Sequence, residues 1–104
     1  MELKPITWLG DSREVVRGFS KPVKDRAGDE LYRLQIGRDP ESWRPMAAIG
    51  PGVREIGISV SGEFRVIYVI RKADGIVVLH AFQKKAQQTS KSDIDIARQR
   101  LKQL

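Results

Sequence analysis

The chain has 104 residues, and its 40% of hydrophobic and 31% of charged residues predict one folded domain over residues 1–104. The absence of cysteine and the single histidine exclude disulfides, thiolate zinc sites, cysteine nucleophiles and two-histidine nuclease sites. A net charge of +6 and an isoelectric point near 10.0 favour a polyanionic partner such as nucleic acid, with a generic solvated surface as an equal alternative.

The N-terminal third predicts a strand followed by two helices. Residues 4–9 form a short apolar opening, and residues 1–10 lack the long apolar run of a signal peptide. No stretch reaches the roughly 18 apolar residues of a membrane span, so we expect a cytoplasmic protein without a membrane partner. Asp11 and Glu14 stand at capping-box spacing for a short helix, and Ser20 can cap a second helix. The second helix has an apolar stripe formed by Val23, Ala27, Leu31 and Leu34.

The middle of the chain, residues 38–52, predicts an irregular loop. Three prolines and two glycines interrupt it, which disfavours both helix and strand. Trp43 and Met46 are expected to anchor this loop to the body of the protein, although a surface role for Trp43 is possible. Gly37 and the following Asp39-Pro40 predict where the second helix ends.

The second half predicts a three-stranded meander and a final helix. Residues 53–60 alternate between apolar and polar, and residues 64–71 form the next strand, with Arg65, Ile67, Val69 and Arg71 on the face opposite Phe64. Ser61-Gly62 is predicted as a two-residue hairpin turn and Asp74-Gly75 as the next turn. Residues 76–82 are nearly all apolar, which predicts an inner strand buried on both faces. After a polar, basic segment, Ser92 and Asp95 stand at capping-box spacing for the last helix.

These elements predict an α+β fold. Two N-terminal helices and a C-terminal helix are expected to cover one face of a small, antiparallel-rich sheet. The first strand, which is distant in sequence from the meander, is expected to add to the edge of that sheet.

Basic residues gather around the predicted sheet, and no standard catalytic motif is present. Arg54 begins the first meander strand, Arg65 lies on the second, and Lys84 and Lys85 follow the third. Metal-free RNA cleavage needs deprotonation of a 2′-hydroxyl, charge stabilisation on the phosphate and protonation of the leaving oxygen. Arg and Lys can supply the second function, and a lysine with a lowered pKa could transfer a proton. The residue types alone favour a simpler alternative, a basic rim that only binds RNA phosphate.

His80 lies within the predicted inner strand. A half-buried histidine bonded to the backbone is the favoured interpretation of its position. Imidazoles in general titrate near neutral pH, so a role as general acid or base stays open.

Several segments resemble a known group of toxins. Residues 62–68, GEFRVIY, resemble the "G-x-[YF]-R-[VL]-x-Y" strand of RelE-superfamily toxins. Residues 79–89, LHAFQKKAQQT, are similar to the "LHgFxKKtqkT" run of HigB-like, phage-related toxins. Residues 43–46 and 52–56 fit the loop and the "gvyEl" strand of that group, and Ile94, Ala97 and Arg98 fit its closing helix.

This resemblance implies a RelE-like toxin fold and membership of a type II toxin–antitoxin pair. Such toxins typically cleave mRNA in the ribosomal A site without metal or cofactor, so the implied partners are a cognate antitoxin, the ribosome and mRNA. The arginine of the "YR" strand is commonly catalytic and corresponds to Arg65. The predicted catalytic residues are Arg65, Lys84, Lys85 and His80. The predicted RNA- or ribosome-binding residues are Arg54, Arg71, Lys91 and Arg98.

The sequence departs from the group at two places. Gly57 stands where many relatives carry a basic residue, and residues 84–104 contain no tyrosine, although some relatives place a catalytic one there. These departures support one alternative function, a ribosome- or RNA-binding module without catalytic activity. A phage accessory protein that binds DNA is the third alternative, disfavoured because no helix pair has a clear recognition-helix pattern.

Overall fold

The structure is a computed structural model that describes residues 2–104. Its class is α+β, as the sequence predicts, and its element order agrees with the prediction except for one additional short strand. In chain order they are β1 (Ile6–Trp8), α1 (Ser12–Arg17), α2 (Lys21–Gln35), β2 (Trp43–Pro45), β3 (Arg54–Ser59), β4 (Glu63–Arg71), β5 (Gly75–Lys84) and α3 (Lys91–Leu101).

The strands form one mixed sheet in the order β1-β5-β4-β3-β2. β1 pairs in parallel with β5, and the other neighbours are antiparallel. The predicted addition of the first strand to the sheet edge is therefore confirmed. β5 lies between β1 and β4 with residues 75–82 buried, as its unbroken apolar run predicts.

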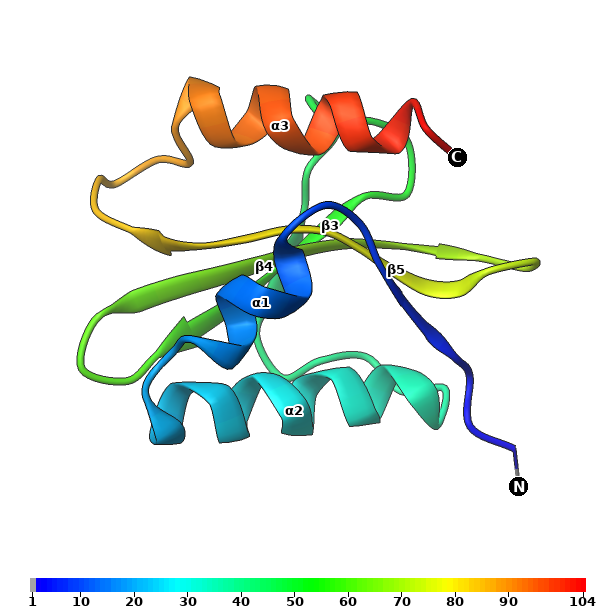
Figure 1. Cartoon of the computed structure of the whole chain (residues 1–104), viewed down its shortest axis with the longest axis horizontal. Helices are drawn as coiled ribbons and strands as arrows, with labels where there is room; N and C mark the ends of the chain where they lie inside the picture. The colour runs from blue at the N-terminus through cyan, green and yellow to red at the C-terminus, as the bar shows by residue number, and fades with distance from the viewer. Residues whose placement is uncertain (1) are drawn as a thin grey trace.

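The helices lie on both faces of the sheet, so the expectation that they share one face is wrong. α1 and α2 pack on one face and α3 on the other (Figure 1). The reason lies in β4 and β5, which are apolar on both sides. Ile67 and Leu79, among others, point away from α2 and pack with Ala97 of α3. One layer of helices would have left this second apolar face in water.

The predicted loop at residues 38–52 contains the edge strand β2, which corrects the sequence interpretation. Trp43 pairs with Ile56, Arg44 with Glu55, and Pro45 with Arg54. A proline is tolerated here because an edge strand leaves one row of backbone groups unpaired. Trp43 remains 36% exposed, whereas Met46 is buried and anchors the segment.

Two predicted helix caps differ in detail. α3 begins earlier than expected, because Ser90 rather than Ser92 is the N-cap and its hydroxyl accepts a hydrogen bond from the Asp93 backbone N–H at 3.1 Å. Asp11 is the N-cap of α1, but its side chain makes no capping bond there. The carboxylate of Asp11 instead binds Arg100 near the end of α3.

A β-bulge in β5 fixes which side chains share the α3 face. Ile67 pairs with His80 and Tyr68 with Val78, so one residue of β5, Leu79, has no partner on β4. Cross-strand partners point to the same face of a sheet. His80 therefore lies on the α3 face with Ile67, and the same register sets Arg65 beside Phe82.

The hairpin between β3 and β4 forms where the sequence places it. Ser61 (φ 53°) and Gly62 (φ 135°) both adopt positive φ, but three residues rather than two separate the paired positions Ser59 and Glu63.

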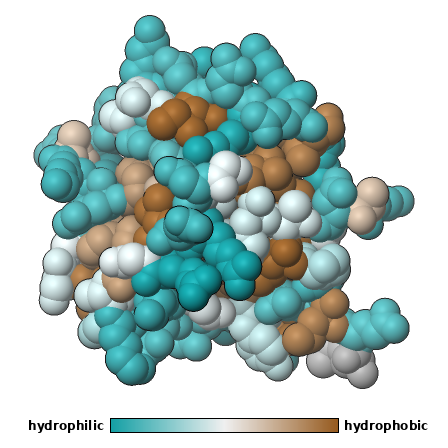
Figure 2. Space-filling view, viewed as in Figure 1, coloured by the Kyte–Doolittle hydropathy of each residue, from teal (hydrophilic) through white to brown (hydrophobic). Residues whose placement is uncertain are grey.

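The molecular surface on the side where α1 lies is largely hydrophilic, with hydrophobic side chains in separate patches (Figure 2). Within residues 2–104, no helix combines the length and the apolar composition that a membrane crossing requires.

Candidate functional site

Arg65 lies on β4 with its side chain only 14% exposed. Nη1 donates to the Phe64 carbonyl at 2.8 Å, and Nη2 lies 3.1 Å from Glu63 Oε1. Nε approaches Glu55 Oε1 at 3.5 Å. The guanidinium is thus fixed from three directions by groups on the sheet, which orders its planar set of donors before any ligand binds.

Glu55 is a buried carboxylate, 1% exposed, that joins three segments of the chain. Its Oε1 accepts from Arg44 Nε at 3.0 Å, and its Oε2 accepts from the Thr89 hydroxyl at 2.7 Å. Arg44 Nη2 also donates to Thr89 Oγ1 at 3.3 Å. A buried charge is costly unless it is paired and hydrogen-bonded, and here both carboxylate oxygens have partners.

A groove of about 880 Å³ opens beside Arg65. The structure brings Arg65, Lys84 and Lys85 together along this groove. Lys84 is the half-buried last residue of β5 and pairs with Glu63, which places it on the face of Arg65. Lys85 follows the strand and is exposed. A smaller, adjoining hollow of about 270 Å³ is lined by both lysines together with Ser90 and Asp93.

Glu63 is the carboxylate of this groove. Hydrogen bonds from Ser59 and then from Arg65 hold the pKa of Glu63 below its usual range. The groove thus carries three cationic side chains and one ionised carboxylate. This excess of positive charge suits an anionic ligand, such as the backbone of a nucleic acid.

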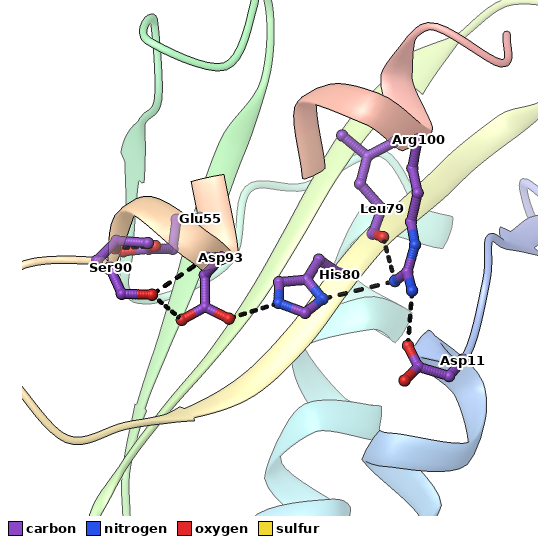
Figure 3. Close-up of polar contacts among 8 residues, drawn as sticks. Asp11, Glu55, Leu79, His80, Ser90, Asp93 and Arg100 are labelled. Atoms are coloured by element: carbon purple, nitrogen blue, oxygen red, sulfur yellow. Dashed lines mark hydrogen bonds and ion pairs between the residues drawn. The ribbon is translucent and has the colours of Figure 1, made fainter. Parts of the chain in front are cut away.

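His80 belongs to a different network, beneath α3 (Figure 3). Its Nε2 lies 2.7 Å from Asp93 Oδ1, and its Nδ1 lies 3.5 Å from Arg100 Nη1. Nε2 is thus the ring nitrogen that faces Asp93, and Nδ1 is the one that faces Arg100. The partner of His80 is therefore a side chain rather than the expected backbone. Both ring nitrogens are engaged and the residue is 7% exposed, so this environment suits a structural histidine.

Arg100 links His80 to the N-terminal part of the chain. Its Nη1 donates to the Leu79 carbonyl at 3.0 Å, and its Nη2 lies 2.9 Å from Asp11 Oδ1. The hydrogen bond from Arg100 lowers the pKa of Asp11. The network therefore ties α3 to β5 and to the start of α1.

The four predicted RNA-binding residues do not line the groove beside Arg65. Arg54 is on the opposite face, where it bonds Asp39 at 3.0 Å and stacks 3.9 Å from the centre of the Trp43 ring. Arg71 ends β4 six residues from Arg65, about 20 Å away at the rise of a strand. Lys91 begins α3, and Arg98 is held further along the same helix by Asp95 and the Ala48 carbonyl.

Sequence reasoning missed the residues that hold Arg65 in place. Glu55, Glu63, Arg44 and Thr89 were not among the predicted site residues. One signal was available, because a meander that pairs Gly57 with Arg65 places Glu55 on the same face of the neighbouring strand. Among residues 2–104, no group of three or more His, Asp and Glu side chains is arranged to hold a metal ion.

Residues 14–102, from within α1 to just beyond α3, match the family described as phage derived protein Gp49-like (DUF891). The chain belongs to this family. The Gp49-like family is phage-derived and toxin-like, in agreement with the toxin character that the sequence motifs imply. A search among curated proteins finds no match to the chain. The Gp49-like region contains Arg65 and every residue that lines its groove.

Proposed function

We propose that this Gp49-like protein has a RelE-like toxin fold and is the toxin of a type II toxin–antitoxin pair. Its activity is that of a metal-independent endoribonuclease that cleaves translated mRNA in the ribosomal A site. The observation that carries this proposal is the fixed guanidinium of Arg65 beside a groove that also presents Lys84 and Lys85. The toxin-like character of the family supports it.

The proposed chemistry is an internal transfer at one phosphodiester. The 2′-oxygen bonds to the adjacent phosphorus and loses its proton, and the bond from phosphorus to the 5′-oxygen breaks. The 5′-oxygen takes a proton, leaving a 2′,3′-cyclic phosphate and a 5′-hydroxyl. Arg65 stabilises the charge that builds on the non-bridging oxygens, and Lys84 and Lys85 bind phosphate or assist proton transfer. The ribosome supplies the alignment of the message that so few groups cannot supply alone.

The proposed partners follow from the charge of the groove. A cognate antitoxin with an acidic or amphipathic segment would cover the three cations and block access of RNA. The proposed location is the cytoplasm, where translated mRNA is the substrate. Co-purification with a small protein encoded beside this gene, and relief of growth arrest by it, tests this part of the proposal.

A second candidate function is a ribosome- or RNA-binding module that does not cleave. Two observations favour it: Gly57 lacks the cation of many relatives, and Arg65 already has two carboxylate partners. A phage accessory protein that binds nucleic acid without the ribosome is a third candidate, and it has less support. The binding module predicts association with ribosomes or RNA without any change in RNA length, and the accessory protein predicts binding to DNA.

The deciding experiment is cell-free translation of a defined message, followed by primer extension. The wild-type protein is expected to produce codon-phased cuts in translated message and only weak cleavage of free RNA. Arg65→Ala should slow cleavage by about 10²–10³-fold while leaving the protein folded, because one preorganised charge contact is lost. Arg13→Ala is the matched control, since Arg13 is an exposed arginine on α1, across the sheet. Binding to ribosomes without cleavage would favour the binding module instead.

A further inference from the structure

The side chain of Arg65 lies directly against Gly57. Gly57 pairs with Arg65 across β3 and β4, and a Cβ atom placed on it would lie 3.5 Å from Arg65 Nη1 and 3.3 Å from Ser42 Oγ. The Arg65 guanidinium therefore lies over the bare backbone of β3 and reaches Glu55. A long basic side chain at position 57 would compete with Arg65 for this space.

Arg44 approaches the same place from β2. Its Nε is 3.0 Å from Glu55 Oε1, the oxygen that Arg65 Nε approaches at 3.5 Å. The two guanidinium groups therefore flank a single carboxylate oxygen. Shared attraction to Glu55 offsets the repulsion that would otherwise push the two cations apart.

Arg44 retains the capacity to bind a ligand. Its side chain is 51% exposed although Nε and Nη2 are held, and Nη1 makes no hydrogen bond within residues 2–104. A cavity of about 130 Å³ is lined by both arginines together with Ser42, Trp43, Glu55 and Gly57. This is room for about four water molecules at roughly 30 Å³ each, which is space for a polar group such as a phosphate.

We propose that Arg44 and Arg65 form a two-arginine clamp for one backbone phosphate of the RNA. In this arrangement Arg44 supplies, from the neighbouring strand, the cation that Gly57 lacks. Glu55 and Thr89 are positioning residues, because their hydrogen bonds hold Arg44 in place. The proposal rests on the proposed function for its substrate class, RNA.

The carboxylate of Glu63 does not bar a phosphate from the clamp. Glu63 is 47% exposed and holds only Nη2 of Arg65, on the side toward the larger groove. Exposed ion pairs of this kind are weak, so a phosphate can take the place of Glu63 on that nitrogen. Glu55, which is buried, stays in place and keeps both guanidinium groups directed at the ligand.

The test measures two quantities for each variant: the cleavage rate in cell-free translation, and the salt dependence of affinity for a short single-stranded RNA oligonucleotide. Arg44→Ala should cleave about 10-fold to 100-fold more slowly. It should also reduce the slope of log affinity against log salt by about 0.7, the value for one phosphate contact on a single strand. Arg13→Ala, the control on the other side of the sheet, should change neither quantity.

Arg44→Lys separates direct contact from support of the fold. Lysine keeps the charge but not the fork of donors, so the salt slope should remain while cleavage slows. The clamp is refuted if Arg44→Ala leaves both quantities at their wild-type values, or if Arg44→Lys loses the salt slope as fully as Arg44→Ala does. Failure of the wild-type protein to cleave translated message would count against the proposed function. The salt slopes would still decide whether Arg44 holds a phosphate.

Discussion

Arg65 and Arg100 are equally buried but have different surroundings. Their side chains are 14% and 16% exposed, and each is held by at least one carboxylate and one backbone carbonyl. Arg65 borders an open groove that it shares with two lysines. Arg100 is packed against the loop before α1, where a Cβ atom on Gly10 would collide with its guanidinium.

Under the proposed function, this difference distinguishes the proposed active-site arginine from an equally buried arginine that ties elements of the fold together. The two arginines differ in what lies against the guanidinium. Arg65 borders an open groove with two further cations, whereas Arg100 lies against backbone and the ring of His80. Variants around the Arg65 groove should therefore alter cleavage with little loss of stability. Variants in the Arg100 network should lower stability with little effect on cleavage by the folded protein.

The largest of these effects is expected at His80. His80→Ala removes the bond to Asp93 and the stacking on Phe82, whose ring centre is 5.2 Å away. Loss of a buried hydrogen bond to a charged partner, with some packing, should lower the free energy of unfolding by about 2 kcal/mol. Urea denaturation measures this change, and cleavage per folded molecule should stay near the wild-type rate. Loss of cleavage with unchanged stability would show that His80 takes part in cleavage, and the two networks would then not differ in role.

A smaller effect should separate the two lysines of the groove. Lys84 shares the face of Arg65 and is half-buried, whereas Lys85 lies beyond the strand and is exposed. Lys84→Ala should reduce the cleavage rate about tenfold, equivalent to roughly 1.4 kcal/mol, and Lys85→Ala by less. Lys24→Ala, an exposed lysine on α2, is the matched control. Equal losses for Lys84 and Lys85 would mean that the groove contributes only general positive charge.

Features set by neighbouring residues in the chain could be predicted from the sequence, whereas features set by contacts between distant segments could not. The meander was predictable because alternation and turn residues are local, and the motif around Arg65 lies within one strand. The same period of two correctly placed Glu55 and Gly57 on one face of β3. The placement of α3 was not predictable from the helix itself, since it depends on which face of β4 and β5 remains uncovered.

The supporting contacts could not be predicted because they join distant segments. Glu55 and Thr89 are 34 residues apart, and Asp11 and Arg100 are 89 apart. The bulge that leaves Leu79 unpaired has no sequence signal of its own, yet it determines which face His80 takes. β2 was hidden because Pro45 disfavours a strand except at the edge of a sheet.

The smallest expected effect concerns Asp11, at the outer end of the Arg100 network. Its carboxylate is 64% exposed, so solvent screens the ion pair and Asp11→Asn should cost only about 0.5 kcal/mol near neutral pH. The hydrogen bond from Arg100 lowers the pKa of Asp11 below its usual 3.8, so the folded protein binds this proton less readily than the unfolded chain. The contribution is therefore present above about pH 4 and is lost as the pH falls through the lowered value.

Urea denaturation of the wild-type and Asp11→Asn proteins, at pH 7 and in steps below pH 4, should show the difference shrinking toward zero. Added salt should shrink it as well, because the pair is exposed. Asp29→Asn is the control, since Asp29 is exposed on α2 and makes no ion pair within residues 2–104. A difference that persists below pH 3 would show that the Asp11 side chain acts through packing or neutral hydrogen bonding. In that case the contribution of Asp11 to the free energy of unfolding would not come from its ion pair with Arg100.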